Sequence, residues 1–266
     1  MAEKQINKSK NALAKENPFP HKNLISVKDF KKRELSFLFE KSSEYFIEYL
    51  DKKISNPKLL DNLISINLFL EPSTRTRVSF EIAAKRLGMG VINFAPSDSS
   101  IGKGETVKST VDTLFAMNPD LIIIRSHDSG LVNYAARTLD CPIINAGDGL
   151  NEHPTQALLD ALTIFYEKIG GVNKTFNLNK GIKTFKNLTI TICGDISHSR
   201  VAHSNLLLLD TLGANLRICG PEELIPDYVK TLNVQIFNDF ERALEGSDVV
   251  MMLRYQKERM NREFNE

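Results

Sequence analysis

The side chains best suited to chemistry in this chain are hydroxyls and arginines placed where they could bind phosphate or carboxylate oxygens. Ser73-Thr74-Arg75-Thr76 follows the apolar run Ile64–Phe69 and leads directly into a helical pattern. A helix N-terminus offers free backbone N–H groups and the positive end of the helix dipole, and arginine adds a planar fork suited to phosphate. One N-cap would explain one hydroxyl, whereas this segment interleaves three hydroxyls with arginines. We therefore predict an anion site here.

Two further segments occupy the same position relative to an apolar run. Arg125 directly follows Leu121–Ile124, where it could reach a ligand or, alternatively, extend to water from the edge of a strand. His153 and Gln156 follow the run Pro142–Asn145 after a glycine-rich turn, at the start of another helical pattern. A lone histidine is more often structural than catalytic, but this position at a strand end favours a functional role. We predict that all three side chains face the same ligand.

The elements that position these residues alternate between apolar runs and amphipathic helical patterns along most of the chain. Strands apolar on both faces and separated by helices indicate parallel sheets covered on both sides. The sequence therefore predicts an α/β fold with two doubly wound domains, whose ligands lie at the carboxyl ends of the strands. We expect an N-terminal tail over residues 1–22, a first domain over 23–165 and a second, incomplete domain over 166–266. The expected helices include Val27–Lys53, Arg77–Leu87, Thr155–Ile169, Val201–Leu212 and one near Glu222–Lys230.

Composition narrows the classes of function. The 266 residues carry a formal net charge of +1, which gives no electrostatic case for a nucleic-acid or membrane partner. No apolar stretch approaches the roughly 20 residues needed to cross a bilayer, and the polar start is unlike a secretory signal. The histidines lack metal-ligand spacing, and the scattered Cys141, Cys193 and Cys219 fit buried thiols in a reducing cytoplasm. We expect no metal.

The segment Ser73-Thr74-Arg75-Thr76-Arg77-Val78-Ser79-Phe80-Glu81 resembles the carbamoyl-phosphate signature shared by aspartate and ornithine carbamoyltransferases, and His153-Pro154-Thr155-Gln156 matches a second pattern of that family. The resemblance implies direct carbamoyl transfer from carbamoyl phosphate, without a cofactor. It implies that Arg75 offsets charge on the departing phosphate, that His153 donates to the carbamoyl oxygen, and that Gln156 binds the carbamoyl NH₂. The implied carbamoyl-phosphate ligands are Ser73, Thr74, Arg75, Thr76, Arg125, His153 and Gln156.

Ser99-Ser100-Ile101-Gly102-Lys103-Gly104-Glu105 resembles a loop that aspartate carbamoyltransferases extend into a neighbouring subunit's active site. On composition alone, Lys103 could equally be a solvated loop lysine. Ornithine enzymes usually show Gly-Arg-Gly-Glu where this chain has Gly-Lys-Gly-Glu. Either Ser99 or Ser100 corresponds to the serine of the family loop. The resemblance implies a homotrimer with shared sites, Lys103 contacting both substrates, and possible regulatory subunits.

The acceptor is predicted from charge. Arg200 and Arg254 each follow a strand-like run in the second half, and an amino acid with two carboxylates needs two cationic partners. Two arginines would repel the cationic side chain of ornithine, so the sequence favours L-aspartate, with Gln256 helping to orient it. The alternative for Arg254 is an ion pair with Glu258. The expected activity forms N-carbamoyl-L-aspartate in pyrimidine biosynthesis.

Two other functions stay open at this stage. One is ornithine carbamoyltransferase, because the donor motifs are shared between both enzymes. The other is a truncated, inactive module that binds carbamoyl phosphate or assembles with partners, because family members continue beyond the point where this chain stops.

Overall fold

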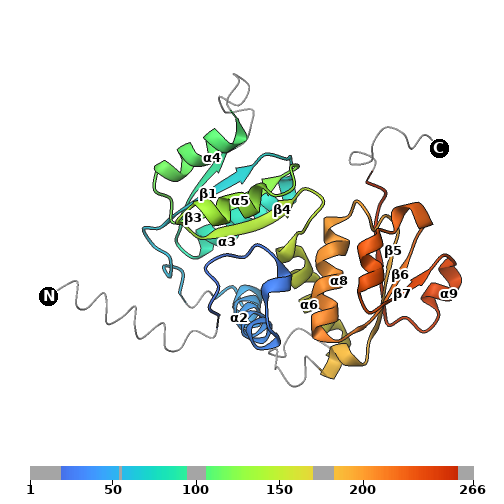
Figure 1. The fold of residues 1–266 in the computed structure, drawn as a ribbon. Coiled ribbons are helices and arrows are strands. Elements are labelled where there is room, and N and C mark those ends of the chain that lie inside the picture. The colour runs from blue at the N-terminus through green and yellow to red at the C-terminus, as the bar shows by residue number, and fades with distance from the viewer. Residues whose placement is uncertain (1–18, 54–55, 95–105, 170–182, 257–266) are drawn as a thin grey trace.

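The protein is described by a computed structural model that covers residues 19–53, 56–94, 106–169 and 183–256. It contains two four-stranded sheets, each with every neighbouring pair of strands parallel. The sheets lie in two separate lobes joined through α6 (Pro154–Ile169) and α8 (Arg200–Leu212), as Figure 1 shows. The predicted α/β class with two parallel-sheet domains is therefore confirmed.

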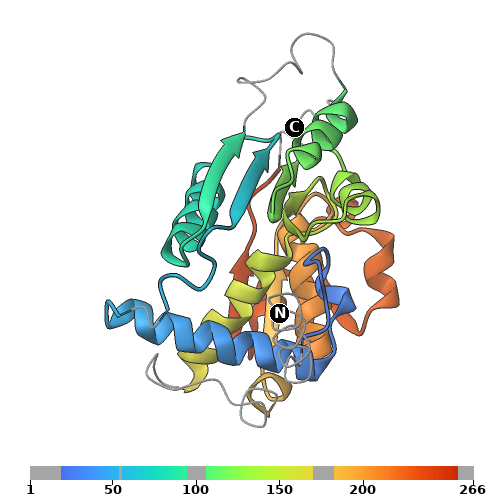
Figure 2. The ribbon, with the colours of Figure 1, turned by 90° about the vertical axis from the view of Figure 1, so that its left-hand side faces the viewer.

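The first sheet has the strand order β2-β1-β3-β4. Its central strands are almost entirely buried because Ile, Leu and Phe side chains fill both faces, as expected for a parallel sheet. In Figure 2, α3 lies against one side of this sheet and α4 and α5 lie on the other. The elements are β1 (Ile64–Phe69), α3 (Thr74–Arg86), β2 (Gly90–Phe94), α4 (Val107–Ala116), β3 (Leu121–Ser126), α5 (Leu131–Thr138) and β4 (Ile143–Asp148).

The second sheet has the order β7-β6-β5-β8, so the chain crosses back after β7 and adds β8 on the free side of β5, as it adds β3 on the free side of β1 in the first sheet. The reversal places the carboxyl ends of β5 and β8 side by side, where a crevice forms in open α/β sheets. The elements are β5 (Thr189–Cys193), α8, β6 (Asn215–Cys219), η4 (Glu222–Leu224), η5 (Asp227–Thr231), β7 (Val234–Phe237), α9 (Phe240–Leu244) and β8 (Val249–Met252).

One hydrophobic core ties the N-terminal helices to the second lobe. Phe39 of α2 (Lys32–Leu50), Phe165 of α6 and Leu206 of α8 belong to the same buried cluster, which also includes residues of the second sheet. The first sheet has its own core around Ile122 and Ile124. The two lobes therefore meet at the packed α6–α8 pair, which is also where the polar strand ends converge.

Two predicted helices differ from the structure, one at its start and one over its whole length. The expected helix Val27–Lys53 is a 3₁₀ turn, η1 (Val27–Asp29), followed by α2, because Phe30 and Lys31 are extended and the Glu34 carboxylate accepts the Lys31 N–H at 2.8 Å. The expected helix near Glu222–Lys230 is two short 3₁₀ segments. Pro226 lies between them, and proline cannot donate to a continuing helix.

Most other predicted elements agree with the structure to within one or two residues, and α3 starts three residues before the predicted Arg77. Within the described residues, no helix is long and apolar enough to span a membrane. Because α3 starts at Thr74, residues Thr74, Arg75 and Thr76 of the predicted anion site lie in its first turn, where backbone N–H groups lack partners within the helix.

Candidate active site

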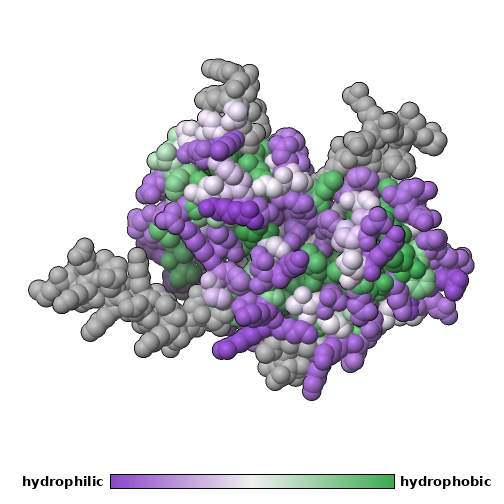
Figure 3. Space-filling view, in the orientation of Figure 1, coloured by the Kyte–Doolittle hydropathy of each residue, from purple (hydrophilic) through white to green (hydrophobic). Residues whose placement is uncertain are grey.

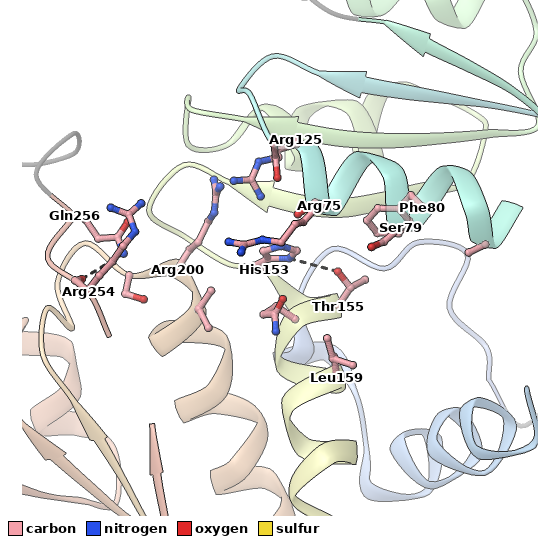
Figure 4. A pocket seen from close by; sticks show the side chains of 16 residues that line it. Arg75, Ser79, Phe80, Arg125, His153, Thr155, Leu159, Arg200, Arg254 and Gln256 are labelled. Atoms are coloured by element: carbon pink, nitrogen blue, oxygen red, sulfur yellow. Dashed lines mark hydrogen bonds between the residues drawn. The ribbon is translucent and has the colours of Figure 1, made fainter. Parts of the chain in front are cut away.

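A crevice of about 650 Å³ lies between the two lobes at the carboxyl ends of the strands. Among the described residues that line it, four are arginines and none is Asp or Glu. The side chains come from both sheets and from the starts of three helices, as Figure 4 shows. The lining residues are Ser73, Arg75, Thr76, Ser79, Phe80, Ala83, Arg125, His153, Thr155, Gln156, Leu159, Ser199, Arg200, Val201, Arg254 and Gln256.

The face of the molecule shown in Figure 3 carries both hydrophilic and hydrophobic residues. In the space-filling view of Figure 3, hydrophilic residues cover most of both lobes, with smaller apolar areas between them. The four arginines of the crevice belong to a chain whose formal net charge is only +1.

The start of α3 forms one wall of this crevice. Ser73 is the N-cap in an extended conformation, and its side chain makes no capping hydrogen bond. Ser73, Arg75 and Thr76 line the crevice, whereas Thr74 begins α3 without lining it. Arg75 is exposed. The hydroxyls and backbone N–H groups of this turn can therefore bind an anion, with Arg75 alongside.

Arg125 lies at the end of β3 and turns inward. Its Nη1 donates to the Ala146 carbonyl at 3.1 Å, and its Nη2 donates to Glu71 Oε1 at 2.8 Å. The Arg125 side chain is only 11% exposed, so the alternative of an arginine extending to water is wrong. The carboxylate fixes the guanidinium at the crevice wall.

Glu71 also binds Arg200, the first residue of α8 in the other lobe. Arg200 Nη2 donates to Glu71 Oε1 at 2.9 Å and Nη1 donates to Oε2 at 3.0 Å, a bidentate pair that crosses between the lobes. Arg200 is buried. Burial lowers the pKa of the Arg200 guanidinium and positive Arg125 lowers it further, whereas Glu71 acts in the opposite direction.

The backbone around β4 is shaped to fit Arg200. Arg200 Nη1 also donates to the carbonyls of Ser126 and Gly149, at 3.3 Å each. Gly147 has a φ of +126°, and a Cβ there would lie 2.7 Å from Arg200 Cζ. Glycine is therefore needed at this position both for its backbone conformation and for the close approach of the guanidinium.

His153 and Gln156 lie at the entrance of α6, as predicted. His153 is buried, its carbonyl accepts from the Gln156 N–H at 3.0 Å, and its own N–H donates to Ser204 Oγ at 2.9 Å. The His153 ring lies at the crevice, with Nδ1 3.4 Å from Thr155 Oγ1 (Figure 4). Gln156 Nε2 donates to Asp160 Oδ1 at 2.8 Å. Both side chains line the crevice.

Arg254 and Gln256 approach from the end of β8. Arg254 is exposed and Nη1 donates to the Tyr255 carbonyl at 3.3 Å, whereas Gln256 is buried and its N–H donates to Asp195 Oδ2 at 3.1 Å. Figure 4 shows both side chains across the crevice from Arg75. The alternative partner of Arg254, Glu258, lies outside the described residues.

The structure thus brings the predicted Ser73, Arg75, Thr76, Arg125, His153, Gln156, Arg200, Arg254 and Gln256 to one crevice. Lys103, Ser99 and Ser100 lie outside the described residues. Two residues at this site were missed from the sequence, Glu71 and Asp160. Glu71 could have been found, since a carboxylate directly after β1 among several strand-end arginines offers the charge balance that buried guanidinium groups need.

Comparison with known families matches both lobes. Residues 22–166 match the family described as aspartate/ornithine carbamoyltransferase, carbamoyl-P binding domain. Residues 186–266 match aspartate/ornithine carbamoyltransferase, Asp/Orn binding domain. The chain therefore falls in the class of the aspartate/ornithine carbamoyltransferases.

Individual relatives indicate which kind of carbamoyltransferase this chain is similar to. The aspartate carbamoyltransferase catalytic subunit of Methylorubrum extorquens is 44% identical to this chain, and the match covers 92% of this chain and 73% of that protein. The catalytic subunit of Erythrobacter litoralis is 46% identical, and the match covers 92% of this chain and 69% of that protein. The crystal structure of Trypanosoma cruzi aspartate transcarbamoylase with carbamoyl aspartate and phosphate has a TM-score of 0.76 and 30% identity over 90% of this chain and 76% of its own. The catalytic subunit from M. jannaschii has a TM-score of 0.71 and 35% identity, covering 90% and 76%. This chain belongs to the aspartate carbamoyltransferase catalytic subunit family.

Proposed function

We propose that this protein transfers the carbamoyl group of carbamoyl phosphate to the amine of L-aspartate, giving N-carbamoyl-L-aspartate and phosphate. The proposal rests on the crevice. Four arginines from the two lobes line it, and none of its described lining residues is Asp or Glu. One negative side chain, Glu71, lies behind two of them and offsets only part of that charge. The relatives named above carry the same activity in their names.

The donor half of the site is the start of α3 with the ends of β3 and β4. In our proposal the phosphate lies against Ser73, Thr74, Arg75 and Thr76, where hydroxyls, N–H groups and the helix dipole bind its oxygens. Arg125 adds a cationic contact, already oriented by Glu71 and the Ala146 carbonyl. Carbamoyl phosphate therefore meets a largely preformed site in the first lobe.

The acceptor half depends on the second lobe. Aspartate brings two carboxylates, and we assign them to Arg200 and Arg254, with Gln256 and Lys103 as further contacts. The cationic side chain of ornithine would meet the same arginines unfavourably. Charge at the crevice, rather than its shape, is thus the feature that favours aspartate over the runner-up acceptor.

The chemistry requires only positioning and electrostatic stabilisation. The neutral aspartate amine attacks the carbamoyl carbon, and negative charge grows on the carbonyl oxygen. Phosphate then leaves with the electrons of the C–O bond and takes up the proton that the amine loses. In our proposal the His153 ring, which lines the crevice, donates to that oxygen, and a preorganised donor of this kind contributes about 10²–10³ in rate. Arg75 stabilises the departing phosphate. Movement of the lobes toward each other would bring the amine onto the carbon.

Assembly is part of the proposal. Following the resemblance of the Lys103 loop, we propose a homotrimer in which Lys103 of one subunit completes a neighbour's site, working in pyrimidine synthesis in the cytoplasm; regulatory subunits would add to this assembly. Mixing Lys103→Ala with Arg75→Ala subunits should restore activity in a fraction of the mixed oligomers. Absence of rescue in oligomers proven to be mixed would argue against shared sites.

The activity is tested by incubating the chain with carbamoyl phosphate and either aspartate or ornithine, and separating the carbamoylated products. We expect carbamoyl aspartate as the main product. Citrulline as the main product would favour the ornithine enzyme. Binding of carbamoyl phosphate without product from either acceptor would favour an inactive binding module. We also expect the chain to bind N-(phosphonacetyl)-L-aspartate, which was captured in the T. cruzi relative.

A further inference from the structure

Asp160 lies below the crevice floor, outside the residues that line it, and it hydrogen-bonds two amide side chains at once. Its Oδ1 accepts from Gln156 Nε2 at 2.8 Å, and its Oδ2 accepts from Asn205 Nδ2 at 2.8 Å. Gln156 and Asp160 are four residues apart on α6 and therefore share one face of that helix. Asn205 comes from α8, so the three side chains bridge the packed helix pair beneath the site.

The acceptor character of Asp160 decides how the Gln156 amide is turned. An ionised carboxylate only accepts hydrogen bonds, so it selects the NH₂ end of a neighbouring amide. Because Nε2 of Gln156 donates to Asp160, the oxygen Oε1 is the part of this amide that can face the crevice. The carbamoyl NH₂ group has two N–H donors and needs an acceptor, which is what Oε1 supplies.

Asn205 anchors the other side of the carboxylate. It is completely buried, and its Nδ2 donates to the Val201 carbonyl at 3.0 Å as well as to Asp160. Both N–H groups of this amide are therefore used, and its orientation is fixed by the backbone of α8. Burial raises the pKa of the Asp160 carboxyl, and the hydrogen bonds from Asn205 and Gln156 offset only part of that rise. The two N–H donors that point at its oxygens from 2.8 Å are the geometry expected around an accepting carboxylate.

We propose that Asp160 is a positioning residue that turns the Gln156 side chain so that its carbonyl oxygen faces the carbamoyl NH₂ of the donor substrate. Nothing in the family resemblance pointed to this residue. The inference rests on the proposed function for the role of Gln156. In this proposal the pocket's preference for an NH₂ group depends on Asp160, a residue of the α6–α8 interface that contacts Gln156 and not the substrate.

Asp160→Asn is the informative substitution, since it keeps size and shape. Asn205 remains oriented by Val201 and still donates, so the new side-chain oxygen must face Asn205 and the new NH₂ group must face Gln156. Gln156 would then turn its oxygen toward the new NH₂ group at position 160. Its own NH₂ group would face the carbamoyl NH₂, so that two hydrogen-bond donors would oppose each other. We expect the Kd for carbamoyl phosphate, measured by calorimetry on the whole chain, to rise roughly 10- to 100-fold. The Kd for inorganic phosphate, which lacks the amide, should stay within about twofold of the unsubstituted protein.

The variants Gln156→Ala and Asp160→Asn/Gln156→Ala complete a double-mutant cycle. We expect Asp160→Asn to have no further effect on carbamoyl phosphate binding once Gln156 is gone. The exposed Asp210→Asn on α8 is the matched control and should leave binding unchanged. Asn205→Ala leaves the Asp160–Gln156 bond in place and should weaken binding much less than Asp160→Asn does.

Thermal unfolding of each variant separates positioning from folding, because only variants that melt as the unsubstituted protein does are compared. A normal Kd in Asp160→Asn, with a raised Kd in Gln156→Ala, would overturn the inference and leave the proposed function intact. An undiminished effect of Asp160→Asn in the Gln156→Ala background would also overturn it, since Asp160 would then act independently of Gln156. A normal Kd in Gln156→Ala would instead remove the role proposed for Gln156, and the inference with it.

Discussion

The starts of α3 and α8 are built from the same parts and are used differently. Each helix follows a strand of a parallel sheet, begins after a serine N-cap and carries an arginine in its first turn. At α8 the Ser199 hydroxyl accepts the Ala202 N–H at 3.1 Å, and Arg200 is buried against Glu71. At α3 the Ser73 side chain makes no capping bond and Arg75 is exposed.

The difference separates a helix start whose cap hydroxyl is open to a ligand from one whose cap hydroxyl is bonded within the protein. At α8 the cap hydroxyl is already used inside the protein, so that helix contributes the charge of one guanidinium held in a fixed place. At α3 the hydroxyl remains available to a ligand. A serine N-cap therefore does not define a phosphate site by itself; what decides is whether its hydroxyl already accepts a hydrogen bond within the protein.

Arg75→Ala tests the start of α3, and we expect it to have the largest effect of these substitutions. The substitution removes the cation that stabilises the departing phosphate, so we expect kcat for carbamoyl transfer to fall about 10²–10³-fold. Arg77→Ala, a change in the same helical turn at a residue that does not line the crevice, is the control and should change kcat little. Similar losses in both variants would mean that the general positive charge of α3, rather than Arg75, supports the reaction.

Glu71→Gln tests the start of α8, where Arg200 is paired with Glu71. Removing this carboxylate leaves Arg200 buried with weaker partners, and breaking a largely buried ion pair destabilises by about 2–4 kcal/mol. We expect the free energy of unfolding in urea to fall by that amount, together with a higher KM for aspartate. Unchanged stability would mean that the bridge between the lobes contributes little to the folded state.

Gly147→Ala tests the close packing around Arg200. The new Cβ would lie 2.7 Å from Arg200 Cζ at a φ of +126°, so we expect a loss of about 1–3 kcal/mol in urea unfolding and weaker aspartate use. Gly130→Ala is the matched control, because its φ is +96° but nothing lies within 4 Å of the added Cβ. Equal effects in the two variants would attribute the whole loss to backbone strain.

Ser73→Ala and Ser199→Ala form the finest test, with the smallest effects and opposite readouts. Ser199→Ala removes a cap and should cost about 1 kcal/mol of stability while leaving phosphate binding nearly unchanged. Ser73→Ala should leave the melting temperature unchanged and weaken phosphate binding by calorimetry. The reverse assignment of the two effects would contradict the distinction drawn between these helices.

Much of the fold could be predicted because its signals are local. The buried strand β3 contains the continuous apolar run Leu121–Ile124, Pro154 marks the start of α6, and Gly213 marks the end of α8. The Val27–Lys53 and Glu222–Lys230 predictions failed where a side-chain cap and a proline overrode an otherwise helical pattern. The extents of the predicted domains stay predictions.

The site was predictable residue by residue but not as a network. Strand-end arginines follow from topology, since parallel strands bring their carboxyl ends to one edge. That Arg200 is bound by Glu71 across the lobes depends on residues 129 positions apart, which no local pattern specifies. Asp160 was missed for a similar reason, because its partner Asn205 comes from another helix.

The central claim is that one crevice holds a phosphate group and an aspartate side by side, with the open α3 start on one side and Arg200 and Arg254 on the other. Calorimetry with N-(phosphonacetyl)-L-aspartate, set against phosphonoacetate, measures that arrangement directly. We predict that the molecule carrying both groups binds at least about a hundredfold more tightly, and that Arg254→Ala removes most of this advantage. Equal affinity of the two molecules for the unsubstituted protein would contradict the claim.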